Sequence, residues 1–105
     1  MTNRLRLPEK YRLMLESLFQ EHLPGVEVWA YGSRLTNRCH DGSDLDLVLR
    51  GPELQEIPIE KLLELRHALQ ESTIPFLVET HDWNHLPDRF HKEIERDFVR
   101  LVKVD

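Results

Sequence analysis

The chain has 105 residues, of which 40% are hydrophobic and 31% are charged. This balance excludes collagen-like, low-complexity and generally disordered proteins. The net charge of −5 argues against stable nucleic-acid binding as the main activity, because such binding depends on neutralising phosphates. No apolar run approaches the roughly 20 residues of a membrane span, and the single cysteine, Cys39, excludes an internal disulfide. We therefore expect one cytoplasmic domain over residues 1–105.

Hydrophobic spacing and turn residues predict helices that alternate with strands along the whole chain. The expected elements are a helix from Pro8 to Pro24-Gly25, a strand over Val26–Tyr31, a short helix over Arg34–Arg38, a strand over Asp44–Leu49, a helix over about Pro58–Glu71, a strand over Phe76–His81, a helix from Pro87-Asp88 through Ile94, and a strand over Val99–Val104 that suits a sheet edge. This order predicts an α/β (α+β) fold, in which helices pack on a mixed sheet of about four strands.

Two aspartates, Asp44 and Asp46, begin the second predicted strand. Because strand side chains alternate, both carboxylates project from one face, while Leu45 and Leu47 point to the other. Two neighbouring like charges repel each other, and a divalent cation removes that repulsion. Mg²⁺ prefers carboxylate ligands combined with substrate phosphates. The pair therefore predicts a metal site.

A second feature lies upstream, where Gly32-Ser33 follows the first predicted strand. Glycine lets the backbone approach a ligand closely, and the N–H groups at a helix start favour a phosphate. Arg34 adds a side chain suited to bidentate phosphate binding, and Ser43 stands directly before the aspartate pair. A phosphate cradle beside a metal-binding carboxylate pair predicts phosphoryl or nucleotidyl transfer.

The spacing of these residues resembles a known signature. Gly32-Ser33, ten intervening residues and Asp44-Leu45-Asp46 are similar to the G-S-x10-D-x-D pattern of the DNA-polymerase-β-like nucleotidyltransferase superfamily. The chain most resembles its minimal nucleotidyltransferases (MNT family), which are typically antitoxins paired with a helical HEPN-family toxin. The resemblance implies the polymerase-β-like fold, a single minimal nucleotidyltransferase domain over residues 1–105, and two Mg²⁺ ions with ATP as substrate.

The resemblance also implies a third carboxylate on a later strand. The matching run is Leu77-Val78-Glu79-Thr80-His81-Asp82-Trp83, in which Glu79 takes the place usually held by an aspartate. Asp82 is the alternative third carboxylate. The implied catalytic and metal-binding residues are Asp44, Asp46 and Glu79, and the implied nucleotide-binding residues are Gly32, Ser33, Arg34 and Ser43.

The family resemblance implies that AMP is transferred from ATP to a tyrosine hydroxyl of a partner HEPN toxin. The two proteins would form a type VII-like toxin–antitoxin pair. Two alternatives stay open: a binding module that neutralises its partner by occlusion, and a small-molecule nucleotidyltransferase completed by a partner subunit. Trp29, Trp83 and Phe90 are more aromatic surface than a small core needs, and such residues are common interface anchors. We therefore expect an exposed apolar patch near Trp83 for a mainly helical partner in a hetero-oligomer.

Overall fold

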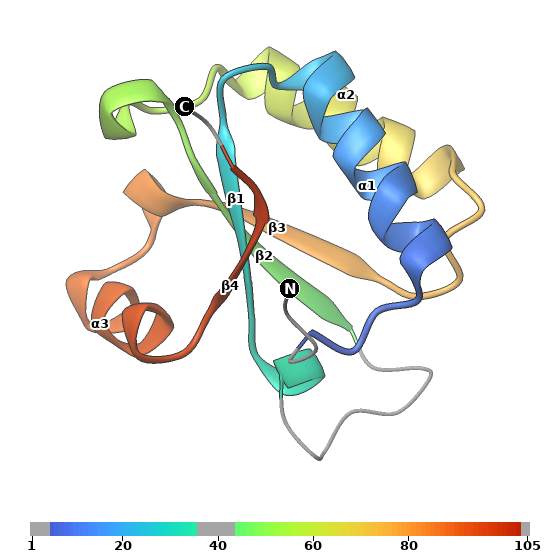
Figure 1. The fold of residues 1–105 in the computed structure, drawn as a ribbon. Helices are drawn as coiled ribbons and strands as arrows, with labels where there is room; N and C mark the ends of the chain where they lie inside the picture. The colour runs from blue at the N-terminus through green and yellow to red at the C-terminus, as the bar shows by residue number, and fades with distance from the viewer. Residues whose placement is uncertain (1–4, 36–43, 104–105) are drawn as a thin grey trace.

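The computed structural model describes residues 5–35 and 44–103. Four strands form a mixed sheet in the order β3-β2-β1-β4 (Figure 1). β1 pairs antiparallel with β2 and with β4, whereas β2 pairs parallel with β3, which requires the crossover that α2 supplies. The elements are α1 (Glu9–His22), β1 (Glu27–Tyr31), η1 (Ser33–Leu35), β2 (Leu45–Arg50), η2 (Pro52–Leu54), α2 (Ile59–Glu71), β3 (Val78–Asp82), η3 (Trp83–His85), α3 (Asp88–Arg96) and β4 (Val99–Val102). The predicted α+β architecture is confirmed.

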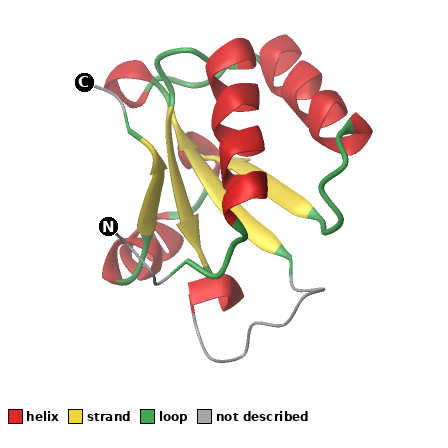
Figure 2. Ribbon diagram, turned by 45° about the vertical axis from the view of Figure 1, so that its right-hand side comes forward, coloured by secondary structure: helices red, strands yellow, loops and turns green. Residues whose placement is uncertain are grey.

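The helices cover the two faces of the sheet unequally. α1 and α2 lie on one face and α3 lies on the other, as the two views in Figures 1 and 2 agree. The larger core lies under α1 and α2, where Leu45, Leu47 and Leu49 of β2 are fully buried against Leu15 and Phe19 of α1. The predicted alternation of β2 is therefore confirmed, and Asp46 is left on the face that carries α3.

A second, smaller core lies on the α3 face. It is built around Trp29, Val48, Trp83 and Ile94. Trp83 packs edge-to-face on Trp29, with 5.6 Å between ring centroids, and stacks on His91 of α3 at 3.8 Å. Trp83 itself does not form the exposed patch expected near it: Trp83 is 7% exposed, because η3 turns its ring inward under α3. Of the three predicted interface aromatics, Phe90 alone is exposed.

The predicted helices and strands differ from the observed ones mainly at their ends. Pro8, Pro58 and Pro87 each stand at the N-cap, directly before α1, α2 and α3, where a missing N–H costs nothing. The single turns η2 and η3 were not predicted, because three residues carry no readable periodicity. Residues 36–38 and Val104 of the expected elements lie outside the described residues. Within residues 5–35 and 44–103, no helix has the length and apolar character to cross a bilayer.

Candidate active site

Asp46 and Glu79 are direct neighbours across two parallel strands. The β2–β3 register pairs Asp46 with Glu79, and both side chains project from the sheet face that carries α3. The two carboxyl groups lie close enough to share a hydrogen bond when one of them is protonated. Asp44 stands directly before β2, is exposed, and its negative charge acts on Asp46. The fold thus brings together two residues that are far apart in the sequence.

The Asp46 carboxyl holds its proton unusually tightly. Partial burial, the hydrogen bond to Glu79 and the negative charges of Glu79 and Asp44 together raise the pKa of Asp46 to about 6. Two adjacent carboxylates repel each other, so the pair is stabilised when one proton is shared between them. A cation placed between the carboxylates would relieve the same repulsion.

Tyr31 is a residue of this site that the sequence analysis did not single out. It lies opposite Asp46 in the β1–β2 register and is half-buried. Burial and the negative charges of Asp46 and Glu79 raise the pKa of Tyr31 to about 12, so its hydroxyl stays protonated and can donate a hydrogen bond. The sequence does contain a signal for it, because Tyr31 is the last residue of the predicted strand Val26–Tyr31 and directly precedes Gly32.

Gly32 is held against the Asp46 carboxylate. Its φ angle is +88°, and a Cβ atom at this position would lie 2.6 Å from Asp46 Oδ2. Only glycine fits this contact and this backbone conformation without strain. The close approach predicted for Gly32 is therefore present, and the nearest group to it among the described residues is the proposed metal ligand.

The other predicted nucleotide-binding residues are placed to different degrees. Ser33 begins η1, directly after Gly32, although the structure describes its backbone alone. Arg34 is 4% exposed; its Nη1 donates to the Arg6 carbonyl at 2.7 Å, and its guanidinium lies 4.0 Å from the centre of the Phe76 ring. These contacts give Arg34 a structural function, and phosphate binding by it stays a prediction. Ser43 lies outside the described residues.

Asp82, the alternative third carboxylate, has a structural function instead. It is 1% exposed and points to the opposite face of β3 from Glu79. Its Oδ2 accepts a hydrogen bond from the Ile57 N–H at 2.8 Å, and its Oδ1 accepts one from the Asn84 N–H at 2.9 Å. Because these donors occupy both oxygens and the sheet separates Asp82 from Asp46, the structure does not bring Asp82 into this site.

The donor set at Asp46 and Glu79 fits a hard divalent cation. Both groups are carboxylates, the ligand type that Mg²⁺ favours, and burial together with the neighbouring Glu79 raises the pKa of Asp46 to about 6. Among the described residues, no three His, Cys, Asp or Glu side chains gather closely enough to hold a metal ion. Two of the three predicted ligands are therefore in contact, and the complete ligand set of Asp44, Asp46 and Glu79 stays a prediction.

Comparison with known proteins identifies the family of this chain. The family described as "Nucleotidyltransferase domain" matches residues 10–102, a stretch that includes both strands of the carboxylate pair and the turn at Gly32. The chain belongs to the nucleotidyltransferase domain family. The family predicted from Gly32-Ser33 and Asp44-Leu45-Asp46 is thereby confirmed, and the protein is a nucleotidyltransferase.

Two similar proteins stand out for this nucleotidyltransferase. One is the probable protein adenylyltransferase MntA of Haemophilus influenzae, which is 31% identical over 88 residues, covering 82% of this chain and 74% of that protein. The other is a crystal structure of a toxin–antitoxin with AMP-PNP, which matches with a TM-score of 0.71 at 15% identity over 92% of this chain and 75% of that one. At this identity, the structural likeness shows the fold alone, and it confirms the expected nucleotidyltransferase fold.

Proposed function

We propose that this nucleotidyltransferase is an antitoxin that transfers AMP from ATP to a tyrosine hydroxyl of a HEPN-type toxin. The main support for this proposal is that Asp46 contacts both Glu79 and the Gly32 turn. A carboxylate pair suited to a metal ion therefore lies beside a backbone turn suited to a phosphate. The protein adenylyltransferase name of the Haemophilus influenzae relative supports protein as the acceptor. The toxin–antitoxin neighbour with AMP-PNP supports a nucleotide and a partner chain. The single cysteine and ATP as substrate favour the cytoplasm.

In this proposal, the residues of the chain bind the substrates and accept the released proton. Gly32 and Ser33 bind the β- and γ-phosphates through backbone N–H groups at the start of η1. Asp44, Asp46 and Glu79 would hold two Mg²⁺, which supply charge neutralisation at the triphosphate. Glu79 accepts the proton of the tyrosine hydroxyl, whose oxygen forms a bond to the α-phosphorus in line with the bond that breaks. Pyrophosphate leaves, and AMP remains on the tyrosine oxygen.

The proposal is tested by co-purifying the chain with the product of its neighbouring gene and adding ATP with Mg²⁺. The expected result is a gain of one or more AMP units in the mass of the partner, located on a tyrosine by fragmentation. Asp44→Ala and Glu79→Gln should abolish that gain. Glu64→Gln is the matched control, because Glu64 is an exposed glutamate on α2, across the sheet from the site, and should transfer normally.

The other outcomes separate the alternatives. A tight complex with no mass gain would replace the proposal with an occlusion module that neutralises its partner by binding. No complex at all would favour a transferase acting on a small molecule. Transfer that survives in both Asp44→Ala and Glu79→Gln would contradict the assigned carboxylates.

A further inference from the structure

A groove runs along the outer edge of β3. Its volume is about 500 Å³, and six consecutive residues of the chain, 76–81, form one wall. Arg66, Leu69 and Gln70 of α2 contribute to the opposite wall. Because the wall consists of consecutive residues, it contains side chains from both faces of the sheet. The hollow therefore follows the edge of the strand and is not confined to one face.

β3 is the terminal strand of the described sheet, so one side of its backbone has no neighbouring strand. The Leu77 carbonyl accepts a hydrogen bond from the Leu45 N–H at 2.9 Å. Leu77 and every second residue after it therefore direct their backbone N–H and C=O groups toward β2. The N–H and C=O groups of Val78 and Thr80 consequently turn outward to the groove. Arg66 already covers one of them, since its Nη2 donates to the Thr80 carbonyl at 2.8 Å.

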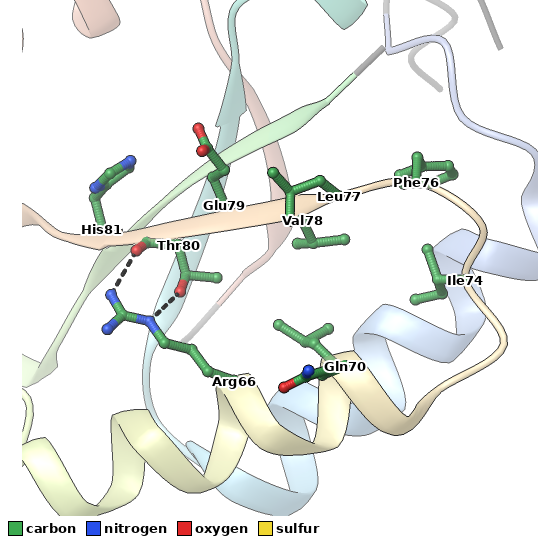
Figure 3. A pocket seen from close by; sticks show the side chains of 10 residues that line it. Arg66, Gln70, Ile74, Phe76, Leu77, Val78, Glu79, Thr80 and His81 are labelled. Carbon is green, nitrogen blue, oxygen red and sulfur yellow. Dashed lines mark hydrogen bonds between the residues drawn. The ribbon is translucent and has the colours of Figure 1, made fainter. Parts of the chain in front are cut away.

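The side chains along this edge divide between two environments. Figure 3 shows Glu79 and His81 projecting from one side of β3, while Thr80 points to the other side, toward Arg66 of α2. Leu77 is 57% exposed at the start of the same edge. The carboxylate proposed to accept the proton thus lies on one side of the groove, and the contact with α2 lies on the other.

We propose that an extended segment of the acceptor protein adds to the edge of β3 as a further strand. This inference rests on the proposed function and names how its substrate binds. The side chains of an added strand alternate between the two faces of the sheet. The acceptor hydroxyl lies on the Glu79 face, and the residues on either side of it enter the groove on the α2 face, against Leu69 and Val78.

The free backbone groups and the charge of this edge favour an extended peptide segment as the ligand. Val78 offers an N–H and a C=O, and Thr80 offers an N–H, to a segment with an extended backbone. In the metal-free chain, the carboxylates of Asp44, Asp46 and Glu79 make the Glu79 face acidic, so basic residues two positions before and after the hydroxyl complement it. A segment with the pattern basic–apolar–tyrosine–apolar–basic satisfies both faces.

The test is an NMR titration of the ¹⁵N-labelled chain with the end-blocked peptide Lys-Val-Tyr-Val-Lys at millimolar concentration. The expected result is a saturable shift of the amide signals of Val78 and Thr80, with slowed hydrogen exchange there. The same peptide N-methylated at its three central residues keeps every side chain but lacks the backbone N–H groups needed to pair with β3, and it should bind at least about tenfold more weakly. Val-Lys-Tyr-Lys-Val, with the same composition in the opposite pattern, should also bind more weakly.

A variant of the chain tests the same edge. Val78→Pro removes an N–H that faces the groove and spares the hydrogen bonds toward β2, so peptide binding should be lost while the fold is kept. Leu13→Ser on α1 is the matched control, because Leu13 is an exposed apolar residue outside the groove and its replacement should leave binding unchanged. If Val78→Pro fails to fold, the N-methylated peptide still tests the backbone pairing.

The outcomes separate this inference from the proposed function. No shift at millimolar peptide, shifts away from β3, or equal binding of the N-methylated peptide would each overturn the added strand, even if AMP reaches the partner protein. Peptide pairing with β3 together with no AMP on the co-purified partner would keep the strand site and contradict the transferase proposal.

Discussion

The backbone of Gly32 packs directly against the carboxylate of Asp46. A Cβ atom on Gly32 would come within 2.6 Å of Asp46 Oδ2, at a φ of +88°. The glycine of the predicted phosphate turn and the aspartate of the predicted metal site are therefore in direct contact. A change at either residue acts on the other.

The Gly32→Ala variant tests this contact. We expect a loss of about 1–3 kcal/mol in the free energy of unfolding and a loss of transfer, because the methyl group is strained at positive φ and displaces Asp46. Gly25→Ala is the matched control: its φ is +84°, but its nearest neighbour, Pro52 Cγ, would lie 3.7 Å from the new Cβ. Urea unfolding measures both. An equal loss in the two variants would show that the Asp46 contact adds nothing.

The second prediction concerns pH. Asp46 has an ordinary pKa of 3.8, and its pKa in the folded chain is raised to about 6. The folded state therefore binds the proton more tightly than the unfolded state, so the free energy of unfolding should fall as pH rises from 3.8 to about 6. In Asp46→Asn this fall should disappear, leaving that variant more stable above pH 6 by roughly 1 kcal/mol, a value reduced for the screening of a half-exposed group. Thermal melts across this pH range, without metal, are the measurement, and a marked loss of stability in Asp46→Asn would contradict it.

The third prediction concerns metal binding. Mg²⁺ should raise the melting temperature of the unmodified chain well above pH 6, because a ligand of the folded state alone stabilises that state. The increase should shrink below pH 6, where a proton occupies the Asp46–Glu79 pair. Asp46→Asn should show little increase at either pH. The same increase in chain and variant would place the cation elsewhere.

The fourth prediction contrasts two aspartates. Asp82→Asn should lower the free energy of unfolding by about 2–4 kcal/mol, because an amide offers one acceptor oxygen where Ile57 and Asn84 each require one. Asp46→Asn should not lower the free energy of unfolding above pH 6, because, within the described part of the chain, Asp46 lacks the two backbone N–H donors that Asp82 binds. Denaturant unfolding of the two variants under one condition decides this. Equal stabilities would mean that the buried bonds of Asp82 contribute little.

The fifth prediction concerns Trp83. Replacement of this ring by alanine should cost about 3–5 kcal/mol, because it leaves a cavity between Trp29, His91 and the sheet. Phe90→Ala, at an exposed aromatic of the neighbouring helix, should cost well under half of that. Thermal unfolding compares the two. A nearly neutral Trp83→Ala would restore the interpretation of Trp83 as an interface residue.

Local patterns were sufficient for the elements and for the first half of the site. The alternation of Leu45, Leu47 and Leu49 determined which face of β2 is buried, and thereby the face from which Asp46 projects. The spacing of Gly32 and Asp46 also predicted the family that the comparisons show. These properties depend on periodicity and short spacing, so they can be read from neighbouring residues.

The tertiary structure alone decided which distant groups meet. Glu79 faces Asp46 because α2 returns the chain to make β3 parallel to β2 in one register, and a shift of one residue would have turned Thr80 to Asp46 instead. The same register sends Asp82 to the buried face, where the Ile57 and Asn84 N–H groups bind it. Trp83 is buried because η3 directs its ring under α3. Strand order and register arise from packing between distant segments, and a linear pattern of residue types does not contain them.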